Sequence, residues 1–181
     1  MSPPIFIETE RLYLRQWKPT DAATYIAMNH DQHVMEFFPA TLTETQSLDH
    51  MNRMISQIDE KGYGLFAVET KADHSFIGFT GFSHPTFDAY FTPCIEIGWR
   101  LVESYWNKGF ATEAAEACLN FGFKKLALTD IYSFTFVDNI RSEKVMQKIG
   151  MKKEGEFDHP LLAGHYLQKH ILYKISKPIT P

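Results

Sequence analysis

The spacing of apolar residues along the chain changes between a period of two and a period near four, and each change predicts a new element. Residues 10–17 (ERLYLRQW) carry Leu12 and Leu14 at alternate positions, which predicts a strand. Residues 18–30 then predict a helix, and the hydroxyl of Thr20 is suited to cap its first turn. The chain therefore begins, in this interpretation, with a strand followed by a helix.

A second helix and three strands are predicted next. Thr43 and Gln46 have the spacing of a capping box, in which each side chain bonds the other residue's backbone N–H. Apolar residues then follow at helical spacing. Two β-rich segments flank a polar KADH tetrapeptide, which predicts a hairpin, and an apolar and aromatic segment after it predicts a central strand. The helix positions are Leu48, Met51, Ile55 and Ile58, and the strand segments are residues 64–70, 75–83 and 93–102.

The clearest helix follows Gly109, and one of its faces is built of small residues. Such a face lets a helix lie close to a sheet or a ligand. After it we expect a strand at 130–137, a short helix at 140–150 ended by Gly150, and two closing strands around residues 158–164. The succession of elements predicts an α/β layer with a mixed sheet. The small face consists of Ala111, Ala114, Ala115, Cys118, Leu119 and Gly122.

Composition narrows the class of protein. With 181 residues the chain is expected to form one domain, residues 1–181. The net charge of −4 gives no reason to expect nucleic acid binding. No apolar run approaches the roughly 20 residues that span a bilayer, and the first residues do not resemble a signal peptide, so we expect a cytoplasmic protein with no membrane partner. Cys94 and Cys118 are interpreted as small core residues.

Gly109 raises a question that these patterns alone leave open. It stands in SYWNKGFATEAAE, residues 104–116, directly before the small-faced helix. A glycine there can serve an ordinary turn with positive φ. It can also let the backbone approach a phosphate group at the N-terminus of the helix.

Four motifs in a fixed order answer this question through a family resemblance. The motifs are EIGW (96–99), WNKGFATEA (106–114), N-x-x-S (139–142) and KIGMKKEG (148–155), and the opening segment 7–22 fits as well. Together they strongly resemble the GNAT superfamily of acetyl-CoA-dependent N-acetyltransferases, with the RimJ/RimL type, which acetylates protein N-termini, as the most similar branch. The resemblance implies a mixed, mostly antiparallel sheet flanked by helices, with a splayed strand pair that holds acetyl-CoA.

The resemblance also implies the residues that bind acetyl-CoA and release coenzyme A. The loop before the small-faced helix would hold the diphosphate on its backbone N–H groups, and the strand before it would pair with pantetheine. Asn139 would contact the pantetheine arm or cap the helix that follows, and Ser142 would lie near the sulfur as a donor to the thiolate, or serve only as a residue of the first turn. The loop residues are Asn107, Lys108, Gly109, Phe110, Ala111 and Thr112, and the strand residues are Trp99, Arg100 and Leu101.

The catalytic residues are harder to assign because two family positions depart from the pattern. Many relatives carry a general-acid tyrosine where this chain has Met146, and some carry a basic glutamate where it has Phe134. Glu96 is our first candidate for the general base, since burial would raise its pKa toward a useful value. It can alternatively be a structural carboxylate. Asp158 and His159 are the next candidates for the base.

The acceptor side is expected between the first two helices and near the end of the chain. Phe37, Phe38, Asp158 and His159 are the predicted substrate contacts, and no metal site is expected from His30 and His33. The function predicted is acetyl transfer to a primary amine, either a protein N-terminus or a small molecule. The alternatives are an enzyme that detoxifies an amine antibiotic or metabolite, and a non-catalytic acetyl-CoA-binding module. The sequence leaves the oligomeric state open, a homodimer included.

Overall fold

An eight-stranded sheet with helices on both faces organises the chain. The computed structural model describes residues 3–177, and all structural statements refer to these. Three short 3₁₀ turns, at Pro19–Asp21, Glu103–Tyr105 and Pro160–Leu162, join some of the elements. The strands are β1 (Ile5–Glu8), β2 (Leu12–Arg15), β3 (Leu65–Thr70), β4 (Phe76–Ser83), β5 (Glu96–Leu101), β6 (Asp130–Phe136), β7 (Lys152–Asp158) and β8 (Lys169–Ser176), and the helices are α1 (Ala22–His30), α2 (Glu44–Lys61), α3 (Phe110–Lys124) and α4 (Ile140–Lys148).

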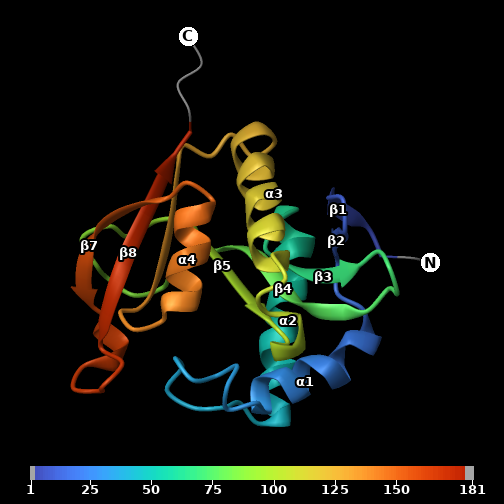
Figure 1. Cartoon of the computed structure of the whole chain (residues 1–181), viewed down its shortest axis with the longest axis horizontal. Coiled ribbons are helices and arrows are strands. Elements are labelled where there is room, and N and C mark those ends of the chain that lie inside the picture. Colours follow the sequence, from blue (N-terminus) through green and yellow to red (C-terminus); the bar gives the residue numbers. More distant parts are fainter. Residues whose placement is uncertain (1–2, 178–181) are drawn as a thin grey trace.

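The strand order places β5 and β6 side by side in the middle of the sheet. The order is β1-β2-β3-β4-β5-β6-β8-β7, and every neighbouring pair is antiparallel except β5 and β6, which are parallel. Figure 1 shows β5 leaning away from β8 and toward α1 and α2. The mixed, mostly antiparallel sheet expected from the sequence is thus confirmed.

Helix α3 packs closely on one face of β4 and β5 because its inner face is small. Ala114, Ala115 and Cys118 are fully buried there. At Gly122 an added Cβ would lie 2.8 Å from the Phe82 ring, so any side chain at this position would have to displace that ring. The interpretation of the small-residue face as a close packing surface is confirmed.

Helices α1 and α2 cover the opposite face. Tyr25 of α1 packs against Phe79 of β4 with ring centroids 6.1 Å apart, and Phe79 points away from Phe82 because the two are three positions apart on one strand. The capping box of α2 is confirmed: the Gln46 N–H donates to Thr43 Oγ1 at 3.2 Å, and the Thr43 N–H donates to Gln46 Oε1 at 2.8 Å.

Two details at the start of the chain differ from the sequence prediction. Strand β1 was not anticipated, since its apolar residues do not alternate with polar ones. Thr20 does not cap α1, because a 3₁₀ turn intervenes and the helix begins at Ala22. The Asp21 carboxylate organises that turn: it accepts the backbone N–H of Lys18 at 2.7 Å and two hydrogen bonds from Arg15 at 2.8 and 2.9 Å.

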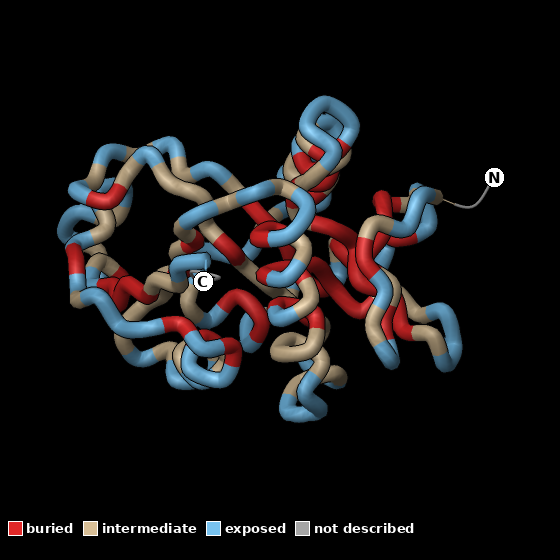
Figure 2. The backbone as a smooth tube through the Cα atoms, turned by 90° about the horizontal axis from the view of Figure 1, so that it is seen from above, coloured by how far each residue is buried: buried red, intermediate tan, exposed pale blue. Residues whose placement is uncertain are grey.

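The hydrophobic core lies between the sheet and its helices. Figure 2 shows the buried segments inside the molecule and the exposed segments in the outer loops and helix ends. A second, smaller cluster around Phe91, Phe157 and Leu172 covers the β6–β8–β7 half of the sheet. Within residues 3–177 no helix combines the length and apolarity that crossing a bilayer requires.

Candidate active site

Strands β5 and β6 are joined at one end and separate at the other. They are in register at Glu96 and Tyr132 alone, where the Tyr132 N–H donates to the Ile95 carbonyl at 2.9 Å. Beyond this pair β5 continues beside β4 to Leu101, and β6 continues beside β8 to Phe136. The splayed strand pair expected from the sequence is therefore present.

The backbone of β5 directs hydrogen-bonding groups into this gap. The Val102 N–H donates to the Ile77 carbonyl of the neighbouring segment at 2.9 Å. Because the backbone groups of an antiparallel strand point to alternate sides, those of Arg100 face β4 as well, whereas those of Trp99 and Leu101 face the gap. The Leu101 carbonyl already accepts a hydrogen bond from Trp106 Nε1 at 2.8 Å. The Trp99 backbone and the Leu101 N–H are thus the groups that suit a pantetheine arm.

The loop after β5 has the backbone form of an anion site. Asn107 and Gly109 both have positive φ, 58° and 83°. Gly109 is the N-cap of α3 and no side chain caps this helix. Among the hydrogen bonds of the described residues, none uses the N–H groups of Phe110, Ala111 or Thr112 as donors. Three free N–H groups at a helix N-terminus suit a diphosphate, and the exposed Lys108 adds a positive charge.

The sequence interpretation gave no role to Arg11, which braces this loop. Its Nη1 donates to the Lys108 carbonyl at 3.1 Å, and its guanidinium carbon lies 4.4 Å from the centre of the Phe110 ring. Its Nε donates to Glu113 Oε2 at 2.6 Å, and Glu113 also accepts from Thr9. These contacts tie the first turn of α3 to the β1–β2 turn. Nothing in the sequence indicated that Arg11 lies beside this loop, because 97 positions separate Arg11 from Lys108.

Glu96 lies at the joined end of the gap, and its side chain is on the face that α1 and α2 cover. Its Oε2 accepts a hydrogen bond from Ser83 Oγ at 2.8 Å. Burial raises the pKa of Glu96 to about 7, and the bond from Ser83 acts in the opposite direction. The alternative of a structural carboxylate paired with a nearby cation is not what the structure shows, because Glu96 makes no ion pair with Arg100, the charged residue four positions along the same strand. At neutral pH the Glu96 side chain is therefore deprotonated in a large fraction of the molecules, and in these it can accept a proton.

Aromatic side chains continue the same face across β6. Because Glu96 is in register with Tyr132, the alternate residues Phe134 and Phe136 share its face. Phe136 packs against Phe37 with centroids 5.9 Å apart, and Phe134 lies 6.1 Å from His159. Phe38 is 39% exposed in the same loop as Phe37.

Of the candidates at the end of the chain, His159 lies on this face and Asp158 does not. The His159 ring lies 4.4 Å from the Phe87 ring, and burial lowers its pKa. Asp158 is exposed, with its carboxylate 3.5 Å from Lys169 Nζ. Since Phe157 faces the aromatic cluster, its strand neighbour Asp158 points away from it. The structure thus brings Phe37, Phe38 and His159 to the side of Glu96.

Helix α4 begins at the far side of the gap. Asn139 Oδ1 accepts the Ser142 N–H at 3.2 Å, so the N-cap role is confirmed, and Asn139 Nδ2 donates to Thr135 Oγ1 at 2.9 Å. The Ser142 hydroxyl makes no hydrogen bond to the described residues and is free for a ligand. Met146 is buried in the core, 1% exposed, and supplies no proton to the gap.

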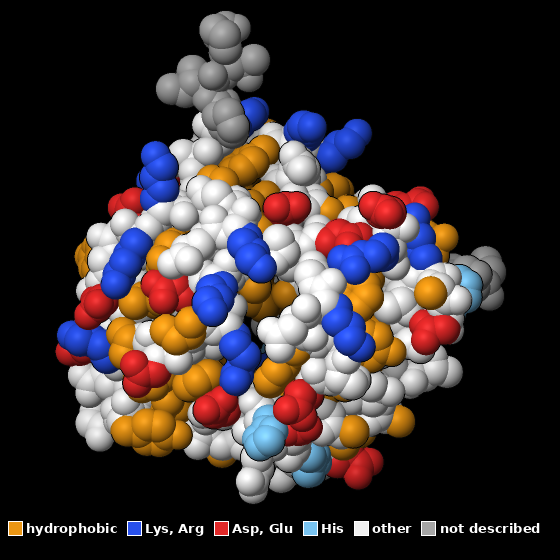
Figure 3. Space-filling model, viewed as in Figure 1, with side chains coloured by type: hydrophobic (Ala, Val, Ile, Leu, Met, Phe, Trp, Pro, Cys, Tyr) orange, Lys and Arg blue, Asp and Glu red, His pale blue; other side chains and the backbone are white. Residues whose placement is uncertain are grey.

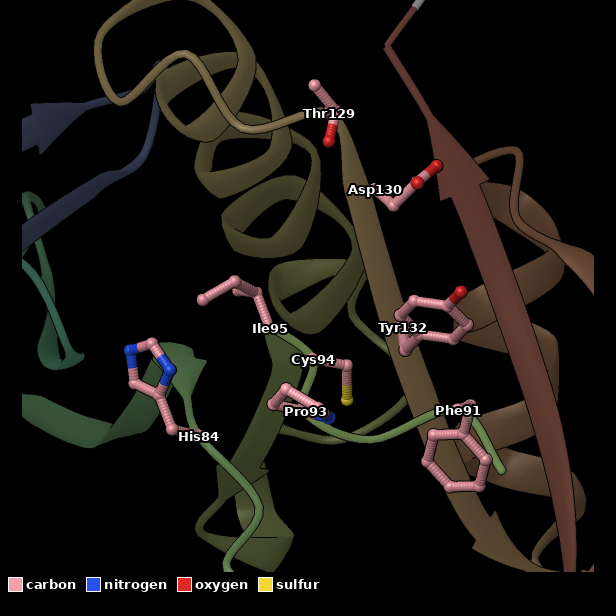
Figure 4. Close-up of a pocket in the computed structure, with 8 residues that line it drawn as sticks. All are labelled: His84, Phe91, Pro93, Cys94, Ile95, Thr129, Asp130 and Tyr132. Atoms are coloured by element: carbon pink, nitrogen blue, oxygen red, sulfur yellow. The ribbon is translucent and has the colours of Figure 1, made fainter. Parts of the chain in front are cut away.

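A cavity of about 380 Å³ lies at the joined end of β5 and β6, opposite the anion loop. Figure 4 shows Cys94, Tyr132 and Asp130 around it. Cys118 fills the core as expected, whereas Cys94 is only partly buried and lines this cavity. Burial raises the pKa of the Cys94 thiol to about 11, so it is protonated at neutral pH. Across residues 3–177 no three His, Cys, Asp or Glu side chains are grouped to hold a metal ion.

Similarity to known proteins agrees with this geometry. The model of a family described as an acetyltransferase (GNAT) domain matches residues 11–152. The chain is 33% identical over 171 residues to the uncharacterized N-acetyltransferase YnaD of Bacillus subtilis (strain 168), covering 93% of this chain and 95% of that protein. An acetyltransferase (GNAT family) from Bacillus anthracis has a crystal structure that matches with a TM-score of 0.80 at 30% identity, over 96% of this chain and 99% of that one.

Two solved structures with named acceptors share the fold at lower identity. Ribosomal-protein-S5-alanine acetyltransferase from Vibrio fischeri has a TM-score of 0.76 at 23% identity, over 98% of this chain and 100% of that one. Spermidine N-acetyltransferase from Vibrio cholerae, in complex with CoA and spermine, has a TM-score of 0.73 at 20% identity, over 93% and 97%. Their names give different acceptors, and these likenesses concern the fold. With its family match and its relatives, the chain belongs to the GNAT family of acetyltransferases and is an N-acetyltransferase.

Proposed function

We propose that the chain transfers the acetyl group of acetyl-CoA to a primary amine in one direct step. The observation that carries this proposal is the separation of β5 from β6, with the Leu101 N–H facing the gap and Glu96 at its edge. Acetyl-CoA, when bound, supplies the acetyl group as an activated thioester. GNAT acetyltransferases use this donor, and the CoA complex of the spermidine enzyme supports it here.

The residues that would hold the donor lie on the two walls of the gap and in the loop beyond it. The N–H groups of residues 110–112 would bind the diphosphate, with Lys108 supplying charge. The backbone of Trp99 and Leu101 would bind pantetheine, and Asn139 has one lone pair left for the same arm. Lys108, Asn107 and Gly109 shape or charge the loop. Arg100, counted with this strand from the sequence, contributes no backbone group to the gap.

Glu96 Oε1 or Oε2 would accept the proton that the amine loses as the nitrogen forms its bond to the acetyl carbon. The Leu101 N–H would donate to the carbonyl oxygen as it gains negative charge. The carbon–sulfur bond breaks, and the Ser142 hydroxyl would donate to the thiolate that leaves. Positioning by the two walls supplies the remainder of the rate enhancement.

Two acceptor classes remain within this proposal. The RimJ/RimL resemblance favours a protein N-terminal α-amine, and a small-molecule amine, including one that is detoxified, fits the same chemistry. The test is release of coenzyme A thiol with peptides and small amines, with mass spectrometry of each amine. The proposal predicts an amine that gains an acetyl group for each thiol released. Thiol release that does not depend on any amine would contradict it.

A further inference from the structure

Arg100 is a second charged residue on the face of Glu96, and the structure gives it no opposite charge. Its backbone belongs to β5, and its side chain shares the Glu96 face because the two are four positions apart. Among the ion pairs of residues 3–177, Arg100 takes part in none. Burial lowers the pKa of Arg100 to about 10. This is the behaviour of a cation that has left water without gaining a carboxylate.

Arg15, which is 2% exposed, makes the contrast clear, because two carboxylates bind its guanidinium. Its guanidinium binds Asp21 at 2.8 Å and Glu69 at 2.6 Å. The groups around Arg100 are instead neutral. Arg100 Nη1 donates a hydrogen bond to Asn29 Oδ1 at 2.8 Å. The Phe38 ring stacks on the Arg100 guanidinium, with the ring centre 4.1 Å from the guanidinium carbon. A buried cation without a counter-ion is costly to the fold, which makes a ligand the natural source of the missing charge.

Two more neutral groups, Tyr25 and His50, lie near Arg100, and both are also within electrostatic reach of the exposed, positively charged Arg53. Tyr25 and His50 are hydrogen-bonded to each other at 2.5 Å, and Tyr25 lies within electrostatic reach of Arg100. Burial lowers the pKa of His50 to about 4, so this ring is uncharged at neutral pH. Neither residue offers Arg100 a negative charge at neutral pH.

The free atoms of Arg100 form the edge that carboxylates prefer. Nη1 is held by Asn29, whereas Nε has no partner and Nη2 donates to none of the described residues. Nε and Nη2 lie on the same edge of a guanidinium and bind a carboxylate through two parallel hydrogen bonds. Nε is shielded from solvent and Nη2 is not, so a ligand would enter from the Nη2 side.

The space between Arg100 and Glu96 is open. Gly98 stands between them on the strand, and the position of its missing side chain has no atom within 4 Å. The two Cα atoms are about 13 Å apart at the rise of an extended strand, and both side chains reach toward the middle. On the side of the molecule where α3 and α4 lie in front, Figure 3 shows a hollow near the centre with Lys and Arg side chains beside it. One acceptor can therefore meet both groups.

The geometry points to a specific acceptor class: Arg100 binds a carboxylate of the acceptor, so the enzyme acetylates amines that also carry a carboxylate. This inference rests on the proposed amine acetylation and deepens it. The carboxylate belongs either to a free amino acid or to an acidic residue next to the acetylated N-terminus of a peptide.

The test compares acids with their amides in the wild type and in Arg100→Gln. One arm uses free amino acids against their carboxamides. The other uses peptides with Glu or Gln at the second position. Thiol release from acetyl-CoA gives kcat/KM for each. We expect a preference of about tenfold or more for the acid in one arm, expressed in KM, and a ratio near one in Arg100→Gln. Arg53→Gln, an exposed arginine on α2, is the matched control and should keep the preference.

Equal use of acids and amides by the wild type, or a preference that survives Arg100→Gln, would overturn the inference. If Arg100→Gln does not fold, Arg100→Lys replaces it: the charge stays but the two-pronged edge is lost, and the preference should fall severalfold. Loss of the preference in Arg53→Gln as well would also overturn the inference.

A binding measurement separates this inference from the proposed function. Coenzyme-A-bound protein is titrated calorimetrically with N-acetylated amino acids and with their amides. If no amine releases thiol, amine acetylation is wrong, yet Arg100-dependent binding of the acids alone would still support the carboxylate site. If thiol is released but no acid binds better than its amide, the carboxylate site is wrong and amine acetylation stands.

Discussion

Ser83 Oγ donates a hydrogen bond to Glu96 Oε2 at 2.8 Å across the β4–β5 pair. This bond favours the ionised carboxylate, against the burial that raises the Glu96 pKa to about 7. The two effects together hold the group near neutrality, where a base for amine acetylation is most effective.

Ser83→Ala should therefore move the acidic limb of the pH profile. Without the donor the charged form of Glu96 is less stable, so its pKa rises further. A base works only when deprotonated, and the limb of kcat/KM should shift to higher pH by roughly 1 unit, the equivalent of one hydrogen bond. The measurement is kcat/KM from pH 5 to 9. A limb that stays in place or moves to lower pH would show that Ser83 does not tune the base.

Glu96→Gln should lower kcat by ~10²-fold or more, with acetyl-CoA affinity nearly unchanged, since general bases typically contribute ~10²–10⁴-fold. The acidic limb should disappear with it. His159→Asn is the comparison on the same face. If the limb is lost only in that variant, the base is His159 and Glu96 is structural.

Gly109→Val should weaken acetyl-CoA binding at least tenfold. Its φ of 83° disfavours any residue with a Cβ, and a side chain there would stand 3.4 Å from Arg11 Nη2, beside the groups that bind the diphosphate. Gly62→Val is the matched control, because Gly62 ends α2 with φ of 73° and open space around it. Both variants should lose ~1–2 kcal/mol of stability. Calorimetry that finds equal acetyl-CoA affinities in the two variants would make Gly109 an ordinary turn residue.

Glu69→Gln should destabilise the fold at neutral pH by about 1.5–3 kcal/mol, because Arg15 loses one charged partner but keeps Asp21. Burial acts to raise the pKa of Glu69, but hydrogen bonds from Lys18, His74 and Arg15 outweigh it and lower the pKa to about 2. A lowered pKa means stability that is present above the ordinary value near 4.5 and is lost as pH falls through 2.

The stability difference between Glu69→Gln and the wild type should thus be constant above about pH 5 and should shrink below it. Urea unfolding at several pH values measures it. Glu60→Gln, an exposed position on α2, is the control and should change little. If this difference in unfolding free energy does not change with pH, titration of Glu69 does not contribute to the loss of stability in acid.

Much of this architecture was predictable because its signals are local. The Thr43–Gln46 capping box and the small face of α3 each lie within one or two turns of helix, and both are confirmed. The motif order around Gly109 gave the family and the splayed strands. Strand β1 was missed because its short apolar run carries no period, and the Thr20 cap was wrong because Asp21 binds Arg15 and Lys18 instead.

The acceptor side was predictable only in outline, since it is made by contacts between distant segments. Phe37 and His159 were chosen as substrate contacts, and the sheet brings both to the Glu96 face through Phe136 and Phe134. Arg100 was assigned to the cofactor strand. Its isolation from carboxylates became visible only once the partners of Arg15 and the neighbours on α1 were known.

In our proposal the gap between β5 and β6 and the Gly109 loop hold acetyl-CoA. The most direct measurement is the thermal unfolding of the wild type with acetyl-CoA, and in parallel with ATP and with a nicotinamide dinucleotide. At ~100-fold over its dissociation constant, acetyl-CoA should stabilise the fold by about 2.7 kcal/mol, and the other two should not. No stabilisation by saturating acetyl-CoA, or an equal shift with ATP, would contradict the account.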